Sequence, residues 1–283
     1  SLTFFCHPSV AKELRKAQSR HTGKRGRPPY SNQLILVLML LKISYGLTYR
    51  SCEGMANSLF SAHSIRIPSY STLCRGIRKL TNLVPRLSNR RPSRFLLDSS
   101  GFKITGEGEW KVKIHGSSYR RSWIKVHILV DSKSNEIMDL VVTPSSEADI
   151  TVAMLLLKDL PGKRTELLAD GAYDGARLRK EAYRKGVQLI VPPPKNGKRR
   201  KGAHMANRNE AIDLIALLGG DKAARSLWGK VTGYNHRVKV ESAFSRLKRL
   251  FGAAAFSRDP DAQFVELWLK AWLSNFWLNL NYV

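Results

Sequence analysis

The chain of 283 residues carries 48 Lys and Arg residues against 22 Asp and Glu residues, a formal net charge of +26. Such a length has room for one large domain and one small domain. The longest apolar run covers residues 34–41, whereas a membrane-spanning helix needs about 20 residues, and no signal-peptide pattern opens the sequence. The three cysteines form no CxxC pair, so the sequence predicts neither a disulfide framework nor a zinc site. We therefore expect a cytoplasmic protein without membrane association that binds a polyanion such as nucleic acid.

The positive charge is unevenly distributed along the chain. It lies mainly in residues 1–94 and 192–283, whereas acidic and basic residues almost balance in residues 95–191. Residues 1–30 form a polar and basic N-terminal segment, which ends in glycines and prolines that prevent a continuous helix.

Residues 31–90 predict a small all-α domain made of three short helices. The segment 31–46 starts at a Ser or Asn cap, the segment 48–60 starts at Thr48, and the segment 68–80 opens with a proline followed by hydroxyl side chains. The third helix would suit a major groove, as the recognition helix of a helix-turn-helix module does. Its DNA contacts would come from Ser71, Thr72, Arg75, Arg78 and Lys79. The alternative is a generic helical bundle that helps the main domain to fold or dimerise.

After a short linker, residues 94–283 predict a larger α/β domain. The spacing of apolar residues first has the two-residue period of strands. Further along, segments with the strand period alternate with segments that have the helix period. The predicted order is strands at 94–104, 122–131 and 136–146, a helix at 147–160, a strand at 165–170, a helix at 174–186 capped by Asp174, a strand at 187–194 and a helix at 234–252. An antiparallel start followed by alternating strands and helices indicates a mixed sheet covered by helices.

Three carboxylates stand out in this domain. Asp98 and Asp170 each follow an apolar run, and we expect them to meet at one edge of the sheet, where open α/β sheets bind ligands. A helix that packs across that edge would bring Glu241 to the same point. Clustered carboxylates repel one another unless a cation joins them, and Mg²⁺ prefers oxygen ligands. Two such ions about 4 Å apart would activate a water or a 3′-hydroxyl and stabilise the leaving oxygen of a phosphodiester.

The helix around Glu241 combines this acid with cations. At 100° per residue, Tyr234, Arg237, Glu241 and Lys248 fall within about 60° of one another, next to an apolar stripe that would face the core. This arrangement predicts an acid that binds metal among cations that bind phosphate.

These motifs carry a resemblance to a known family. The spacing Tyr234-x₂-Arg237-x₃-Glu241-x₆-Lys248 resembles the Y-R-E-K signature of bacterial and archaeal insertion-sequence transposases with a DDE triad, of the insertion-sequence family five type. The segment "LADGAYDG" is similar to the second-aspartate motif of that family, and "FLLDSSGF" is similar to the first. The segments "GLTYRSCEGM" and "YSTLCRGIRKL" resemble its N-terminal helical part.

The resemblance implies a ribonuclease H-like catalytic domain, Mg²⁺-dependent cleavage at transposon ends and transfer of the freed 3′-OH into target DNA. Asp98, Asp170 and Glu241 would be the catalytic residues and would ligate two Mg²⁺ ions, with Mn²⁺ as a substitute. Tyr234, Arg237 and Lys248 would contact double-stranded DNA at the inverted-repeat ends. The short basic insertion 192–233 before the glutamate helix is unlike the longer strand-rich insertions of members that cut through a DNA hairpin.

Several alternatives remain open on the sequence. The chain could be a domesticated DNA-binding protein derived from a transposase, or a metal-dependent DNA nuclease without strand transfer. Because transposition joins two transposon ends, we expect a homodimer. We expect the protein in a prokaryotic cytoplasm, associated with the nucleoid. Within the chain, Trp228 is expected to pack in the core rather than to stack on an extruded base. The C-terminal stripe of Trp268, Trp272, Phe276 and Leu280 is expected to close the core or, secondly, to form a dimer contact.

Overall fold

The computed structural model describes residues 8–18, 29–104 and 123–280 of the chain. The chain divides into two compact units. The helical unit comprises Ser1–Pro85 and Ala255–Leu273, and the sheet unit comprises Arg86–Ala254 and Ser274–Val283. The expected division at residues 31–90 and 94–283 follows chain order alone, whereas the compact units give residues 255–273 to the helical unit.

In its described part, the helical unit contains the three predicted helices, a further helix before them and part of the C-terminal helix. Its elements are α1 (Pro8–Gln18), α2 (Asn32–Ser44), α3 (Tyr49–Phe60), η1 (Ser61–His63), α4 (Tyr70–Gly76), η2 (Ile77–Leu80) and the first part of α11 (Pro260–Leu280). Ser31, Thr48 and Ser69 cap α2, α3 and α4, because each side-chain oxygen accepts a hydrogen bond from the backbone N–H three residues later. Helix α1 was not predicted from the basic N-terminal segment.

The third predicted helix is not one continuous α-helix. It ends as an α-helix at Gly76 and continues as the 3₁₀ segment η2. Gly76 lies against α2 so closely that a Cβ there would be 2.6 Å from Cδ1 of Ile35. Glycine therefore permits the close approach of α4 to α2, which places Ile77 and Leu80 in the core.

The sheet unit contains the predicted mixed sheet. Its strands are β1 (Arg94–Ile104), β2 (Trp123–Asp131), β3 (Ile137–Pro144), β4 (Thr165–Leu168), β5 (Val187–Ile190) and the two-residue β6 (Ala254–Ala255). The first five follow the order β3-β2-β1-β4-β5. Strands β1, β2 and β3 pair antiparallel, whereas β4 is parallel to both β1 and β5. The predicted α/β fold with an antiparallel start is confirmed.

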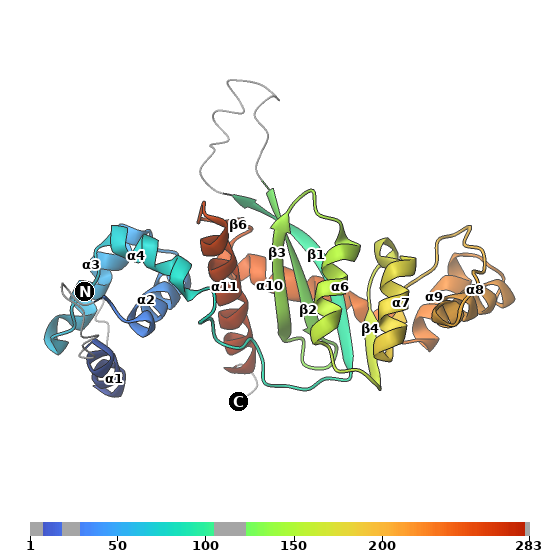
Figure 1. Cartoon of the computed structure of the whole chain (residues 1–283), viewed down its shortest axis with the longest axis horizontal. Coiled ribbons are helices and arrows are strands. Elements are labelled where there is room, and N and C mark those ends of the chain that lie inside the picture. The colour runs from blue at the N-terminus through green and yellow to red at the C-terminus, as the bar shows by residue number, and fades with distance from the viewer. Residues whose placement is uncertain (1–7, 19–28, 105–122, 281–283) are drawn as a thin grey trace, which may run out of the picture. The chain divides into compact units, whose positions relative to one another are not determined.

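Helices cover both faces of this sheet (Figure 1). Between β3 and β6 the helices of this unit are α6 (Asp149–Asp159), η3 (Gly171–Tyr173), α7 (Ala176–Lys185), η4 (Ala203–Met205), α8 (Ala206–Leu217), α9 (Lys222–Val231), η5 (Tyr234–Arg237) and α10 (Val238–Phe251). Helices α8 and α9 lie beside the β5 edge of the sheet rather than on a face (Figure 1). Figure 1 shows α6 and α7 in front of the sheet and α10 behind it. The core between the sheet and α6 and α7 includes Leu97, Leu129, Val152, Leu156 and Leu178. Helix α9 was not predicted.

The C-terminal helix corrects one prediction. Phe276 and Leu280 are 46% and 54% exposed, so the predicted aromatic stripe does not close the core. The buried face of α11 contains polar side chains that bind backbone groups instead. Glu266 accepts hydrogen bonds from the amides of Phe256 and Ser257, and Asn275 binds both the N–H and the C=O of Ile137. Because those backbone groups need partners when buried, the polar side chains occupy the inner face.

No single helix in the described ranges is long and apolar enough to cross a membrane. The segments Asn32–Ser44 and Tyr49–His63 are together long and apolar enough to cross a membrane, but they are bent by 113° relative to each other.

Candidate active site

Asp98 lies on β1, and Asp170 lies just after the end of the neighbouring parallel strand β4, where it caps η3. The last residues that pair between β1 and β4 are Leu96 and Leu168, so Asp98 and Asp170 each follow that pair by two residues. Strand β4 ends at Leu168, whereas β1 continues past Asp98 because it also pairs with β2. Asp98 is therefore not at the end of its own strand but lies just beyond the end of β4.

Both carboxylates are held by local backbone amides. Oδ1 of Asp98 accepts a hydrogen bond of 2.8 Å from the N–H of Ser99, and Oδ1 of Asp170 accepts one of 2.9 Å from the N–H of Ala172. Burial raises the pKa of Asp98, and the charge of Asp170 adds to this increase, whereas the Ser99 amide and Arg237 oppose it. A cation at this edge would therefore favour the ionised form of Asp98.

Arg237 joins two of the three predicted acids. Its Nη1 lies 3.0 Å from Oδ2 of Asp98, and its Nη2 lies 2.9 Å from Oε1 of Glu241. Asp98 and Arg237 are each 19% exposed in their side chains and Glu241 is 59% exposed, so the cluster opens toward solvent at Glu241. Tyr234 and Arg237 lie in the 3₁₀ segment η5, not in the α-helix that the sequence predicted, and α10 begins at Val238.

The ring of Tyr234 packs against the ring of Trp228. The two ring centroids are 5.3 Å apart with their planes tilted by 39°, and Trp228 is only 3% exposed. Trp228 thus packs in the core, as expected. Burial raises the pKa of Tyr234, although the guanidinium of Arg237 lowers it, so the phenol is neutral in the site.

Lys248 lies further along α10 against the same face of β1. Its Nζ donates a hydrogen bond of 2.6 Å to Oγ of Ser100 and lies 5.1 Å from the ring centroid of Phe102. Burial lowers the pKa of Lys248. Because side chains alternate along a strand, Asp98, Ser100 and Phe102 share the face that α10 covers.

The donor set suits a hard divalent cation on chemical grounds. Asp98, Asp170 and Glu241 offer carboxylate oxygens, the ligands that Mg²⁺ prefers. In this arrangement the guanidinium of Arg237 supplies the positive charge between Asp98 and Glu241. Within the described part of the chain, no group of three His, Cys, Asp or Glu side chains is close enough to hold a metal ion. A bound ion would therefore have to share Asp98 and Glu241 with Arg237 or displace it.

A polar network lies on the opposite face of β1, and sequence reasoning missed it. Oγ of Ser99 and Nζ of Lys125 both donate to Oδ1 of Asp149, at 3.1 and 3.2 Å. His127 is fully buried, with Nε2 3.1 Å from Oγ1 of Thr143 and Nδ1 3.6 Å from Asp149. Burial lowers the pKa of His127 to about 4. The available signal was a lysine and a histidine two positions apart in one strand, Lys125 and His127, which therefore share a face of the sheet.

Asp174 is not the helix cap that the sequence predicted. Gly175 occupies the cap position of α7, and the carboxylate of Asp174 binds two arginines instead. Its Oδ1 lies 2.8 Å from Nε of Arg179, and its Oδ2 lies 2.9 Å from Nε of Arg208. The exposed fraction is 7% for the Asp174 side chain and 2% for each arginine side chain. Asp174 lies four residues after Asp170, so this closed cluster anchors the segment that carries a predicted catalytic acid.

The residues predicted to read DNA lie in α4 and in η2. Ser71, Arg75, Arg78 and Lys79 are exposed and Thr72 is half-buried. The hydroxyls of Ser71 and Thr72 lie 3.2 and 3.0 Å from Oγ of Ser69, and Arg78 lies 3.3 Å from Asp259 within the same unit. Arg75 in α4 and Lys79 in η2 are thus solvent-exposed cations four residues apart.

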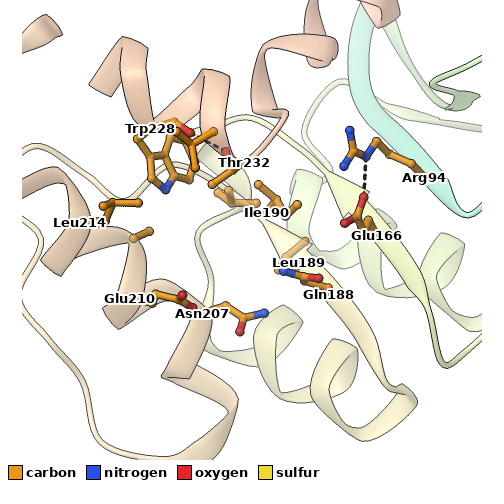
Figure 2. A pocket seen from close by; sticks show the side chains of 13 residues that line it. Arg94, Glu166, Gln188, Leu189, Ile190, Asn207, Glu210, Leu214, Trp228 and Thr232 are labelled. Carbon is orange, nitrogen blue, oxygen red and sulfur yellow. Dashed lines mark hydrogen bonds and ion pairs between the residues drawn. The ribbon is translucent and has the colours of Figure 1, made fainter. Parts of the chain in front are cut away.

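A cavity of about 290 Å³ lies between the β5 edge of the sheet and helices α8 and α9 (Figure 2). Figure 2 shows Trp228, Leu214 and Ile190 along it, and the ion pair between Arg94 and Glu166 at one side. Asp98, Asp170 and Glu241 are not among the described residues that line it. The cavity is therefore separate from the carboxylates.

Known structures resemble the chain only weakly. The chain is 13% identical to a chain of the simian T-cell lymphotropic virus intasome in complex with PP2A regulatory subunit B56 gamma, with a TM-score of 0.26, and the match covers 64% of this chain and 66% of that one. The piggyBac transposase synaptic complex with hairpin DNA gives 8% identity, a TM-score of 0.32 and coverage of 96% and 77%. The Mos1 transposase paired-end complex with left transposon end gives 11% identity, a TM-score of 0.26 and coverage of 84% and 83%.

The sequence itself matches a family. Residues 89–276 match the family described as "Transposase DDE domain", and residues 1–107 match a second family with the same description. The first match covers most of the sheet unit, including Asp98, Asp170 and Glu241. The chain belongs to the DDE transposase family, whose members are enzymes that act on DNA and depend on divalent metal ions.

Proposed function

We propose that this chain is an insertion-sequence transposase that binds inverted-repeat ends, cleaves DNA phosphodiester bonds and transfers the 3′-OH ends into target DNA. The observation that carries the proposal is the register of β1 with β4, in which Asp98 and Asp170 each follow the last pair by two residues, together with Arg237, which pairs with both Asp98 and Glu241. The strand order and directions support a ribonuclease H-like catalytic domain.

Asp98, Asp170 and Glu241 would hold two Mg²⁺ ions, with Mn²⁺ as a substitute. When bound, such ions polarise the phosphodiester and lower the pKa of a coordinated water. The backbone amides of Ser99 and Ala172 orient Asp98 and Asp170, so the positions of both acids are fixed before substrate arrives.

The cations around the acids would bind the DNA backbone. Arg237 presents a planar guanidinium, which suits two oxygens of one phosphate, and Lys248 presents an ammonium held by Ser100. Tyr234 would contact terminal DNA through its neutral hydroxyl. Each of these contacts positions the scissile bond without reading sequence.

The helical unit would supply end recognition. Its third predicted helix would enter a major groove as part of a helix-turn-helix-like module, using Ser71, Thr72, Arg75, Arg78 and Lys79. The protein would act as a homodimer that joins two ends, in the cytoplasm at the nucleoid.

A cleavage assay on end-labelled duplex DNA with the native gene flanks tests this function. Wild type is expected to make discrete cuts near the flanking repeats that need Mg²⁺ or Mn²⁺. Asp98→Ala is expected to reduce cleavage by more than about 1,000-fold and to leave DNA binding intact, because the acid would act on the reacting phosphate.

Two outcomes would point elsewhere. Tight binding to the flanks without cleavage by wild type in either metal would favour a DNA-binding relic. Metal-dependent cutting that survives deletion of residues 1–90 would favour a nuclease that does not need the predicted end-recognition helices.

A further inference from the structure

An exposed loop after β5 gathers cations. Residues 195–201, here named the basic loop, contain Lys195, Lys198, Arg199, Arg200 and Lys201, all exposed. Of these five cations, only Arg199 forms an ion pair with a carboxylate in the described part of the chain, at 3.0 Å from Asp213. Like charges held together at a surface repel one another, so the loop favours an anionic partner.

The backbone of the basic loop is held in one conformation. Nη1 of Arg208 donates a hydrogen bond of 2.7 Å to the carbonyl of Lys198. Asn209 binds Arg200 twice, through Oδ1 to its N–H at 3.0 Å and through Nδ2 to its C=O at 2.8 Å. A loop whose backbone is already fixed loses less conformational entropy when its side chains bind a ligand.

The same hydrogen bonds connect the loop to the catalytic segment. Arg208 is buried and pairs with Asp174, which follows Asp170 by four residues. A second buried arginine, Arg179, shares that carboxylate and reaches the carbonyl of Val191 at 3.4 Å. Arg225 binds the carbonyls of Pro193 and Pro194, just before the loop. The loop is therefore fixed relative to Asp170 through buried side chains.

The chemistry of the loop selects the ligand. It offers ammonium and guanidinium groups but no aromatic side chain on which an unpaired base could stack. Separated cations without stacking residues match the phosphates of a duplex backbone, whose contacts carry no sequence information.

We propose that the basic loop is a second DNA-binding surface, separate from Tyr234, Arg237 and Lys248, which holds the phosphate backbone of duplex DNA in a fixed position relative to Asp170. The proposal rests on the proposed function, since it concerns DNA held by the same chain.

The test compares two triple variants of the full chain. Lys195, Lys198 and Lys201 are changed to Gln in the loop variant, and Lys133, Lys163 and Lys180 are changed to Gln in the control, which removes the same charge from other exposed positions of the sheet unit. Binding to duplexes with and without the native ends is measured by fluorescence anisotropy from 0.05 to about 0.5 M KCl, a range over which phosphate contacts are strongly screened.

In the loop variant, the slope of log K, where K is the association constant, against log [KCl] is expected to become less negative by about 3. Binding to both duplexes is expected to weaken by the same factor, on the order of 100-fold at 0.1 M KCl. The control is expected to change the slope by less than about 1, and Lys→Arg at the three loop positions is expected to restore it. Equal slopes for the loop variant and the control would overturn the proposal. That result is distinct from failure of the proposed function, which would appear as absence of cleavage by wild type whatever its affinity for DNA.

Discussion

Two arginine–carboxylate clusters of the sheet unit, one at Asp98 and one at Asp174, differ in their exposure to solvent. Around Asp174 every charged side chain is at most 7% exposed, and the two arginines also bind backbone carbonyls. The cluster around Asp98 is open to solvent, because the side chain of Glu241 is 59% exposed. Arg237 forms ion pairs with both Glu241 and Asp98. Buried charges are tolerated only when their hydrogen bonds are complete, which holds in the closed cluster.

The comparison separates structure from function. A closed cluster has no access for a ligand, so the Asp174 cluster serves to hold the loop after β5 and the segment after Asp170. In an open cluster, another cation can replace Arg237 beside the carboxylates, or a phosphate can replace a carboxylate beside Arg237. Pairing geometry alone does not distinguish the two clusters, since their distances are similar, from 2.8 to 3.0 Å. Burial distinguishes them.

The largest expected effect breaks the closed cluster. Asp174→Asn keeps the side-chain size but removes the one carboxylate that neutralises Arg179 and Arg208. Two buried guanidinium groups are then left uncompensated, so we expect the free energy of unfolding to fall by about 3–5 kcal/mol. Urea-induced unfolding measures this change. The matched change in the open cluster, Glu241→Gln, is expected to cost less than about 1 kcal/mol because that acid is largely solvated; equal losses in both variants would refute the comparison.

The second prediction concerns His127, which is buried and whose Nδ1 forms no hydrogen bond within the described part of the chain. Burial lowers its pKa to about 4 from the ordinary 6.5, despite the opposing charge of Asp149, and Lys125 lowers it further. A lowered folded-state pKa means that protonation favours the unfolded chain. The contribution of neutral His127 to the free energy of unfolding is fully present above pH 6.5 and is lost as the pH falls toward 4. By pH 4 the loss amounts to about 3 kcal/mol.

Urea titrations of wild type and His127→Gln across pH 7.5 to 4 measure this loss. The variant cannot be protonated at this position, so its free energy of unfolding is expected to fall less over the same range. Parallel pH profiles for the two proteins would show that His127 does not carry the dependence.

The smallest expected effect sharpens the open side of the comparison. Arg237→Met should lower the free energy of unfolding by about 1 kcal/mol, because its partner Glu241 is largely solvated and only Asp98 is mostly buried. It also leaves Asp98 and Glu241 without their cation, so Mg²⁺ or Mn²⁺ should raise the melting temperature more in the variant than in wild type. Thermal denaturation with and without metal measures both quantities, and Lys239→Met serves as the control, because its ammonium binds the carbonyl of Ser132. A metal-induced shift no larger than that of wild type would contradict the idea that Arg237 occupies a cation site.

Much of the fold could be predicted from local patterns. The bounds of β1 match the prediction, and Ser31, Thr48 and Ser69 were predicted as helix caps or helix starts, because strand alternation and capping depend on residues within a few positions of one another. Asp174 failed the same kind of reasoning. A carboxylate before a helix is a good local cap, but here two buried arginines compete for it and prevail.

The candidate site was predicted in composition but not in arrangement. The sequence indicated that three acids and several cations belong together, through their motifs and the period of the helix after Gly233. It did not indicate that Arg237 would bridge Asp98 and Glu241, since that contact joins positions 139 residues apart and depends on a 3₁₀ turn in η5. The helix period used in the prediction does not apply within that turn.

The sequence by itself therefore determined the net positive charge, the order of the strands and helices, the DDE family and the acids that carry its motif. Tertiary structure decided which acids lie side by side, which arginine–carboxylate cluster is open, and which face of α11 is buried. The physical reason is the range of the interactions. Periodicity and capping act between near neighbours in the chain, whereas strand register and burial arise only when distant segments pack and exclude water.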